Sequence, residues 1–120
     1  MMILKKKYYL FIENTREFNL DNIKIREKFN IIYRNQSTKE NIQNLLSYRK
    51  DCRKYGIKFY VANNISLLSK LKADGLYISS YNKDLMLKSN LLKTKFKILG
   101  SAHNLKEIKI KELQNVDEIF

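Results

Sequence analysis

With 120 residues, the chain is long enough for one domain with its own apolar core, so we expect a single domain over residues 1–120. A hydrophobic fraction of 44% argues against wholesale disorder, and no apolar run reaches the roughly 18 residues that a membrane-spanning helix needs. The lysine-rich start does not resemble a secretory signal, and the lone cysteine, Cys52, has no partner for an internal disulfide. These features predict a cytoplasmic protein without membrane contact, in which Cys52 is a packing or surface thiol.

The formal net charge of +12 is the strongest bias in the composition. A basic surface attracts nucleic acids, so a basic nucleic-acid-binding module is one hypothesis. However, the positive residues are mostly lysines spread along the whole chain, whereas nucleic-acid sites usually gather arginines and aromatic residues on one face. We therefore favour a solvated basic surface over a nucleic-acid-binding face.

The N-terminal part of the chain predicts alternating strands and helices. In order, they are a strand over 8–12, a short helix over 20–29, a strand over 29–33 and a helix that ends at Gly56. Ser37 or Thr38 is expected to cap the second helix, with Glu40 in its first turn.

Residues 56–82 carry the clearest pattern. The apolar, β-rich run 57–62 predicts a strand, and Asn63-Asn64 then forms a turn and a helix cap. Apolar residues recur at helical spacing as far as Leu71, and Gly75 is expected to end this helix in the left-handed conformation. A strand over 76–78 follows. Because a helix that joins two strands of one sheet returns the chain to its starting end, the two strands are expected to be parallel.

The last part of the chain continues the alternation. The expected elements are a helix over 85–92, a strand over 96–99, a helix over 105–113 and the start of a strand over 116–120. Five strand–helix units and a sixth strand leave two architectures, a doubly wound open sheet or a (β/α)8 barrel. Neither a glycine-rich dinucleotide loop nor a Walker-type phosphate loop is present, which counts against a nucleotide-binding open sheet.

In both architectures, functional residues gather where strands end and helices begin. Polar residues stand at every such position in this sequence, namely Glu13, Asn14, 34–36, Asn63, Asn64, 79–82 and 101–104. They include an arginine, several amides and hydroxyls, and the only histidine of the chain, so we predict one polar rim along this edge.

Three stretches of this rim form a recognisable set: Val61-Ala-Asn-Asn64, Leu71-Lys-Ala-Asp-Gly-Leu-Tyr-Ile78 and Gly100-Ser-Ala-His-Asn-Leu-Lys-Glu107. In order and spacing, the set resembles the motifs of thiamine phosphate synthase and its TenI-like relative, the thiazole tautomerase. The resemblance implies an incomplete TIM (β/α)8-type barrel of about six parallel strands with five intervening helices. It also implies a truncated copy of the family's domain, whose open barrel edges favour self-association.

The family's site residues are carried over one position at a time. Its second strand ends in Gln-x-Arg-x-Lys, of which only Arg34 is kept here, and a guanidinium can hold two phosphate oxygens at once. The synthase holds Mg²⁺ with an aspartate after the third strand and another after the fourth, where this chain has Asn63 and Asn82. An amide oxygen can ligate Mg²⁺ but supplies no charge, so we expect no metal cofactor. The two asparagines then either contact the substrate or only form caps and turns.

Ser101 and His103 match the family best. The resemblance implies that this serine contacts pyrophosphate in the synthase, and that this histidine moves a proton on the thiazole carboxylate in the tautomerase. Histidine suits that role because its unperturbed pKa, about 6.5, lets it take and give a proton near neutrality. Its alternative role is a hydrogen bond at the start of the following helix.

Three functions remain open at this point. The first is an enzyme of thiamine biosynthesis that acts on a phosphorylated thiazole or pyrimidine substrate, closer to the tautomerase than to the Mg²⁺-dependent condensation with hydroxymethylpyrimidine pyrophosphate. The second is a degenerate, non-catalytic protein of the same fold that binds a phosphorylated ligand. The third is the basic nucleic-acid-binding module.

Overall fold

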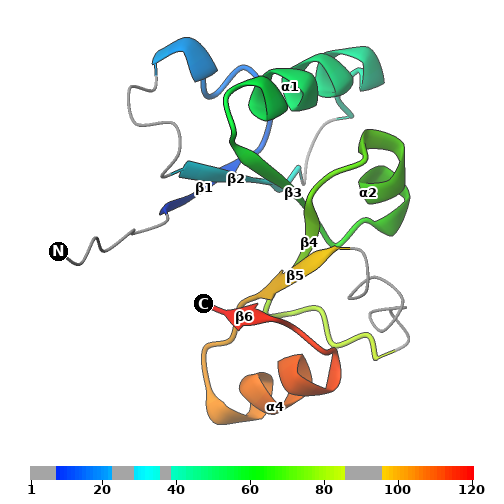
Figure 1. The fold of residues 1–120 in the computed structure, drawn as a ribbon. Coiled ribbons are helices and arrows are strands. Elements are labelled where there is room, and N and C mark those ends of the chain that lie inside the picture. The colour runs from blue at the N-terminus through cyan, green and yellow to red at the C-terminus, as the bar shows by residue number, and fades with distance from the viewer. Residues whose placement is uncertain (1–7, 23–28, 36–38, 86–95) are drawn as a thin grey trace, which may run out of the picture.

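The computed structural model describes residues 8–22, 29–35, 39–85 and 96–120. Six strands form one sheet in chain order, and each pairs in parallel with the next. They are β1 (Tyr8–Ile12), β2 (Phe29–Tyr33), β3 (Lys58–Ala62), β4 (Gly75–Ile78), β5 (Lys97–Gly100) and β6 (Glu118–Ile119). The α-helices of the described residues are α1 (Ile42–Lys54), α2 (Ile65–Leu71) and α4 (Leu105–Leu113). Figure 1 shows them on the outer side of a curved sheet. Within the described ranges, none of the helices is long and apolar enough to cross a bilayer.

The sheet curves so strongly that its first and last strands meet through their side chains. The Tyr9 hydroxyl of β1 donates to Oε2 of Glu118 in β6 at 3.0 Å, and the Tyr9 and Phe120 rings lie 4.9 Å apart. The Phe11 and Tyr77 rings, from β1 and β4, lie 5.2 Å apart on the same concave side. A parallel sheet that curls back toward its own first strand is part of a (β/α)8-type barrel, so the predicted incomplete barrel is confirmed.

The two faces of the sheet bury different side chains, because alternate residues of a strand point to opposite faces. The outer face and the helices over it form the main core, with Ile12, Ile31, Leu45, Phe59, Val61, Leu68, Leu71, Leu76, Ile78 and Ile98 among its members. The concave face buries a smaller cluster, Ile32, Tyr60, Tyr77 and Leu99. Burial on both faces explains why these strands read as continuous apolar runs. Cys52 lies in the outer core, and burial raises the pKa of its thiol to about 12, as expected for a packing residue.

Helix α1 begins later than predicted. Its N-cap is Asn41, whose side-chain oxygen accepts a hydrogen bond from the amide two residues further on, so the prediction of Ser37 or Thr38 as the cap is wrong. Glu40 lies before the helix rather than in its first turn. Its carboxylate accepts hydrogen bonds from the backbone amide and the hydroxyl of Thr15, which hold it against the loop after β1.

The prediction that Gly75 ends helix α2 in the left-handed conformation is also wrong. Lys72 has that role, with φ of 48°, and Gly75 is the first residue of β4. A Cβ at Gly75 would lie 2.1 Å from the Lys97 carbonyl oxygen and 2.6 Å from the Tyr60 ring. The glycine is therefore required by the close approach of its neighbours. At the other end of α2, Asn64 is the N-cap, as predicted.

Two of the five expected helices cannot be followed completely. In place of the helix predicted over 20–29, the described residues hold the 3-10 turn η1 (Leu20–Asn22), and 23–28 lie outside the described ranges. Phe29 belongs to β2, because its backbone pairs with Tyr8 of β1. Most of the helix predicted over 85–92 also lies outside the described ranges. The helix over 105–113 and the strands over 8–12 and 29–33 have the predicted bounds.

Candidate functional site at the strand ends

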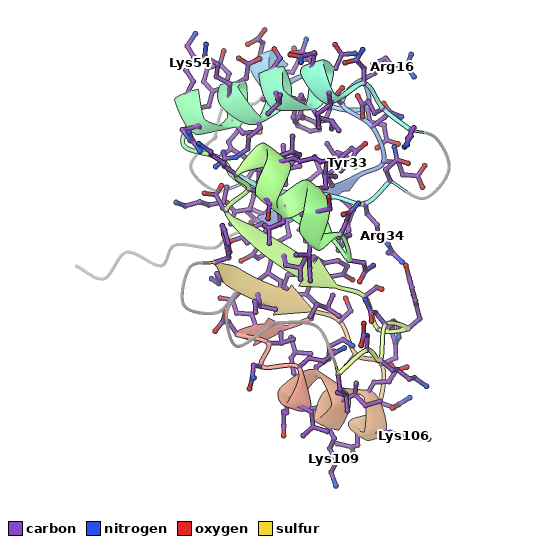
Figure 2. All side chains as sticks on the ribbon, turned by 90° about the vertical axis from the view of Figure 1, so that its right-hand side faces the viewer. Arg16, Tyr33, Arg34, Lys54, Lys106 and Lys109 are labelled. Carbon is purple, nitrogen blue, oxygen red and sulfur yellow. The ribbon has the colours of Figure 1, made fainter. Side chains whose placement is uncertain are left out.

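The carboxyl ends of the parallel strands meet at one edge of the sheet, and Arg34 stands there directly after β2 (Figure 2). Tyr33 points into the outer core, so Arg34, the next residue, faces the concave side. Exposed lysines such as Lys54, Lys106 and Lys109 lie on the outer helices instead. The basic surface therefore spreads over the helices, while a single guanidinium marks this part of the rim.

Arg34 lies between two hollows at the rim. One, of about 480 Å³, is lined by Arg34, Asn35, Ala62, Asn63, Asn64 and Tyr81, and the other, of about 320 Å³, by Phe11, Ile12, Glu13, Glu17 and Arg34. The guanidinium carbon lies 6.0 Å from the centroid of the Tyr81 ring. Its Nε is buried and has no hydrogen-bond partner among the described residues. A buried donor of this kind gains free energy when a ligand oxygen reaches it.

Asn63 is the centre of a hydrogen-bonded group on the next two strand ends. Its Oδ1 accepts from the Ser79 amide at 3.1 Å and from Nδ2 of Asn82 at 2.9 Å. Its Nδ2 donates to Oγ of Ser79 at 3.0 Å and to the Tyr81 hydroxyl at 3.3 Å. The φ of Asn63, 57°, is left-handed, which asparagine tolerates better than most residues. The structure thus places Arg34 and Asn63 on the wall of one hollow and bonds Asn82 to Asn63, which covers only part of the rim predicted from the sequence.

Ser101 and His103 follow β5 and stand outside this group. The Ser101 hydroxyl shares a hydrogen bond with the hydroxyl of Tyr77. The His103 side chain is 76% exposed, and its Nδ1 lies 3.4 Å from Oε1 of Glu107, which also accepts the His103 backbone amide at 2.7 Å. Neither Ser101 nor His103 lines the two hollows that contain Arg34.

The sequence of residues 5–120 matches a family described as thiamine monophosphate synthase. The chain belongs to this family. It is 25% identical over 114 residues to the thiamine-phosphate synthase of Fusobacterium nucleatum subsp. nucleatum, a match that covers 95% of this chain and 52% of that protein. Its structure resembles the thiamine phosphate pyrophosphorylase of Pyrococcus furiosus with a TM-score of 0.64 and 17% identity, over 96% of this chain and 58% of that one, which shows a shared fold. The chain spans about half the length of these relatives.

Apart from Arg34, the side chains that line the hollow of about 480 Å³ are neutral. The two positions at which the resemblance implies metal-binding aspartates carry Asn63 and Asn82, and the oxygen of Asn63 already accepts two hydrogen bonds. Within the ranges that the structure describes, no three His, Cys, Asp or Glu side chains are grouped so that they could hold a metal ion. Neutral amides and hydroxyls fit a hydrogen-bonded organic ligand better than a small, hard dication.

Lys111 of helix α4 and Gln114, the C-cap of that helix, hold the loop after β4 at this rim, and the sequence did not point to either residue. Lys111 is completely buried, and its Nζ donates to the Asn82 carbonyl oxygen at 2.9 Å. Gln114, also buried, donates from Nε2 to the same oxygen at 2.9 Å and to the Asp84 carbonyl oxygen at 3.1 Å. Burial lowers the pKa of the Lys111 ammonium. Helix α4 and its C-cap therefore hold the loop after β4, which carries Asn82, by hydrogen bonds.

Proposed function

We propose that this chain acts in thiamine biosynthesis by binding a thiazole phosphate-type substrate at the Arg34 rim and by moving a proton on it, without a metal ion. The observation that carries the proposal is the buried Nε of Arg34, which has no partner in the part of the chain that the structure describes and lies beside a hollow of about 480 Å³. Hollows of about 300–1,000 Å³ suit small ligands, and a phosphate group would satisfy a guanidinium with two parallel hydrogen bonds.

The polar group next to Arg34 supports an organic ligand. Asn63 and Asn82 hold each other and the loop after β4, so the wall of the hollow is fixed before a ligand arrives. A fixed wall lowers the entropy that binding costs. Because both residues are neutral, they favour proton transfer over the metal-assisted release of pyrophosphate.

His103 is the residue that we propose for the proton transfer. Glu107 lies against Nδ1 of the imidazole, which leaves Nε2 on the far side of the ring for a substrate. A carboxylate on one nitrogen orients the ring, so that the other nitrogen can face a substrate. The step removes a proton from one position of the thiazole and returns it to another, so that no further reactant is consumed.

The alternative is a non-catalytic protein that binds the same phosphorylated ligand. The exposure of His103 and its absence from both Arg34 hollows favour this second function. The two functions share the ligand and differ only in turnover.

Calorimetric titration with a thiazole phosphate tests the binding step. We expect Arg34→Gln to weaken binding by about 10- to 100-fold, because a charge-assisted hydrogen bond contributes about 1.5–3 kcal/mol. The control is Arg53→Gln, which removes the same charge from an exposed position on α1 and should leave binding unchanged. Equal affinities of the two variants would contradict the proposed phosphate site.

Proton transfer is read in the same samples from deuterium uptake by the thiazole in D2O, followed by proton NMR. We expect uptake with the unsubstituted chain and none with His103→Gln, whose affinity for the ligand should be retained. Binding without uptake in the unsubstituted chain would establish the non-catalytic alternative.

A further inference from the structure

A third hollow, of about 800 Å³, lies between α1 and α2 and adjoins the Arg34 hollow of about 480 Å³, with which it shares Asn35, Ala62 and Asn64. Tyr33 forms part of its wall, whereas Arg34, the next residue, faces the concave side of the sheet. The volume falls in the range of about 300–1,000 Å³ that is typical of small-molecule sites. Nothing in the proposed thiamine chemistry uses this hollow.

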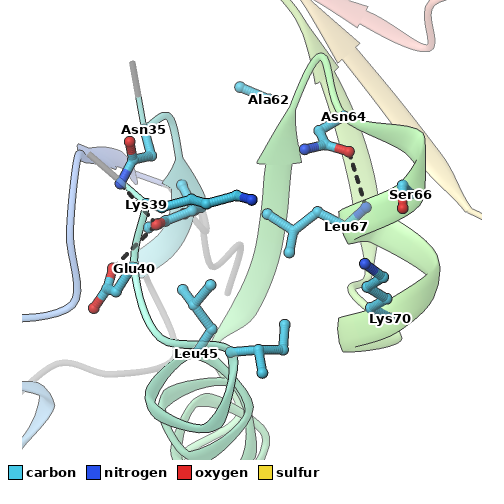
Figure 3. Close-up of a pocket in the computed structure, with 11 residues that line it drawn as sticks. Asn35, Lys39, Glu40, Leu45, Ala62, Asn64, Ser66, Leu67 and Lys70 are labelled. Carbon is cyan, nitrogen blue, oxygen red and sulfur yellow. Dashed lines mark hydrogen bonds between the residues drawn. The ribbon is translucent and has the colours of Figure 1, made fainter. Parts of the chain in front are cut away.

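Two ammonium groups face this hollow from its opposite walls. Lys39 reaches from the segment after β2 toward α2, and Lys70 stands on α2 itself (Figure 3). Both side chains are exposed, and neither has an acidic partner among the described residues. Their charges are therefore available to a ligand.

Glu40, the acidic residue among those that line this hollow, already accepts hydrogen bonds from neighbouring side chains and backbone. Oε1 of Glu40 accepts from the Tyr33 hydroxyl at 3.0 Å, and both carboxylate oxygens accept from the Thr15 amide at 3.1–3.2 Å. These bonds turn the carboxylate toward the loop after β1 and away from the two lysines. With two ammonium groups and one carboxylate, the lining has a net charge of +1, which one negative charge balances.

The remainder of the lining combines polar residues, Asn35, Asn64 and Ser66, with an apolar part on α1 and α2. Leu45 of α1 and Leu67 of α2 lie at the junction of the two helices, and Ile42 is 37% exposed at the first turn of α1. An apolar ligand body would cover this surface and release water from it.

We propose that this hollow binds a small organic monoanion, a carboxylate with an aromatic or branched apolar body. The carboxylate lies between Lys39 and Lys70, and the body packs on Ile42 and Leu67. Phosphate monoesters, which are the ligands proposed for the rim, carry nearly two charges and leave this lining unbalanced. The two hollows share Asn35, Ala62 and Asn64 in their walls, but Lys39, Lys70 and Leu67 line this hollow and not the one beside Arg34. The two proposals are therefore separated by different variants and different probes.

The probe is 8-anilinonaphthalene-1-sulfonate, a fluorescent monoanion with a large apolar body. We expect the Lys39→Gln/Lys70→Gln variant to bind it about tenfold more weakly than the unsubstituted chain. The matched control is Lys50→Gln/Lys54→Gln, which removes the same two charges from exposed positions of α1 outside the hollow and should bind as the unsubstituted chain does. The neutral analogue N-phenyl-1-naphthylamine should also bind more weakly. Equal losses in the two double variants would overturn the proposal, since they would reflect net charge alone.

The location is read from methyl NMR signals during the same titration. The Ile42 and Leu67 methyl groups should shift, while those of Ile32 and Leu99, on the concave face, should not. Shifts confined to Ile32 and Leu99 would place the probe inside the curved sheet and would likewise overturn the proposal.

Discussion

Helices α2 and α4 occupy equivalent places after β3 and β5, yet they bury opposite kinds of side chain. Helix α2 turns Leu68 and Leu71 fully into the outer core. In α4, the fully buried side chain is Lys111, while Leu105 and Leu113 are 78% and 66% exposed. The difference indicates two tasks: α2 stabilises the sheet by apolar burial, and α4 holds the loop after β4 by hydrogen bonds.

Stability and the geometry of the rim therefore depend on different helices. Burial of a leucine side chain contributes about 1.5–3 kcal/mol, whereas a hydrogen bond contributes about 1 kcal/mol on balance. We therefore expect the main resistance to unfolding in the unit of β3, α2 and β4, and the position of Asn82 to depend on α4.

The largest predicted effect comes from the same substitution in each helix. Leu68→Ala should reduce the free energy of unfolding by about 2–5 kcal/mol, because Leu68 is completely buried and the substitution leaves a cavity. Leu113→Ala should change it by less than about 0.5 kcal/mol, since its side chain is mostly exposed. Urea unfolding of both variants measures the difference. Similar losses in the two variants would show that α4 is packed as α2 is, and would contradict the proposed difference between the two helices.

An intermediate effect is expected from alkaline pH, which acts on the outer core. Burial, opposed by the hydrogen bond from Asn35 and reinforced by Glu40, raises the pKa of Tyr33 to about 12. In the unfolded chain tyrosine ionises near pH 10, so Tyr33 contributes stability that is full below about pH 10 and lost as the pH rises through about 12. The contribution is of the order of 2–3 kcal/mol, from about 1.4 kcal/mol for each pKa unit.

The measurement is urea unfolding of the unsubstituted chain and of Tyr33→Phe at pH 8 and pH 11. The variant should lose less stability between the two values. Tyr60→Phe, on the concave face, should do the same, because burial also raises the pKa of Tyr60. An unchanged pH dependence in both variants would mean that neither hydroxyl is sequestered from water in the folded state.

The parts of the fold that the sequence predicted are those that depend on local pattern. Continuous β-rich runs place β1 and β2 at their observed bounds, and helical spacing does the same for α4. Gly75 shows where local reading fails. A glycine after a helix resembles a helix end, but this one is set by the Lys97 carbonyl and the Tyr60 ring, which approach from elsewhere in the chain.

Some residues of the candidate site were likewise predictable from local sequence, and others were not. Arg34, Asn63 and Asn82 could be placed on one rim because strand ends are visible in the sequence and parallel strands end together. Lys111 could not, since it stands in a helix between exposed lysines and polar residues and nothing local distinguishes it from Lys109. Its partners, the Asn82 carbonyl and the backbone at Gly100, come from elsewhere in the chain.

A small effect on stability, and the most specific test of α4, is expected from Lys111→Met. Methionine fills a similar volume and removes a buried charge, so the free energy of unfolding should change by less than about 1 kcal/mol. The Asn82 carbonyl, however, keeps only its bond from Gln114, and the loop after β4 should open more often. Hydrogen exchange at the Ser79 and Asn82 amides, which are bonded to Asn63 and to Ser79, measures that opening.

The control is Lys109→Met, which makes the same change at an exposed position of α4. If the Ser79 and Asn82 amides exchange several-fold faster in Lys111→Met alone, while urea unfolding is nearly the same in both variants, α4 acts on the rim and not on the core. Equal exchange rates would reduce Lys111 to a space-filling residue. The hollow beside Arg34 would then owe its shape to Asn63 and its own partners, without help from α4.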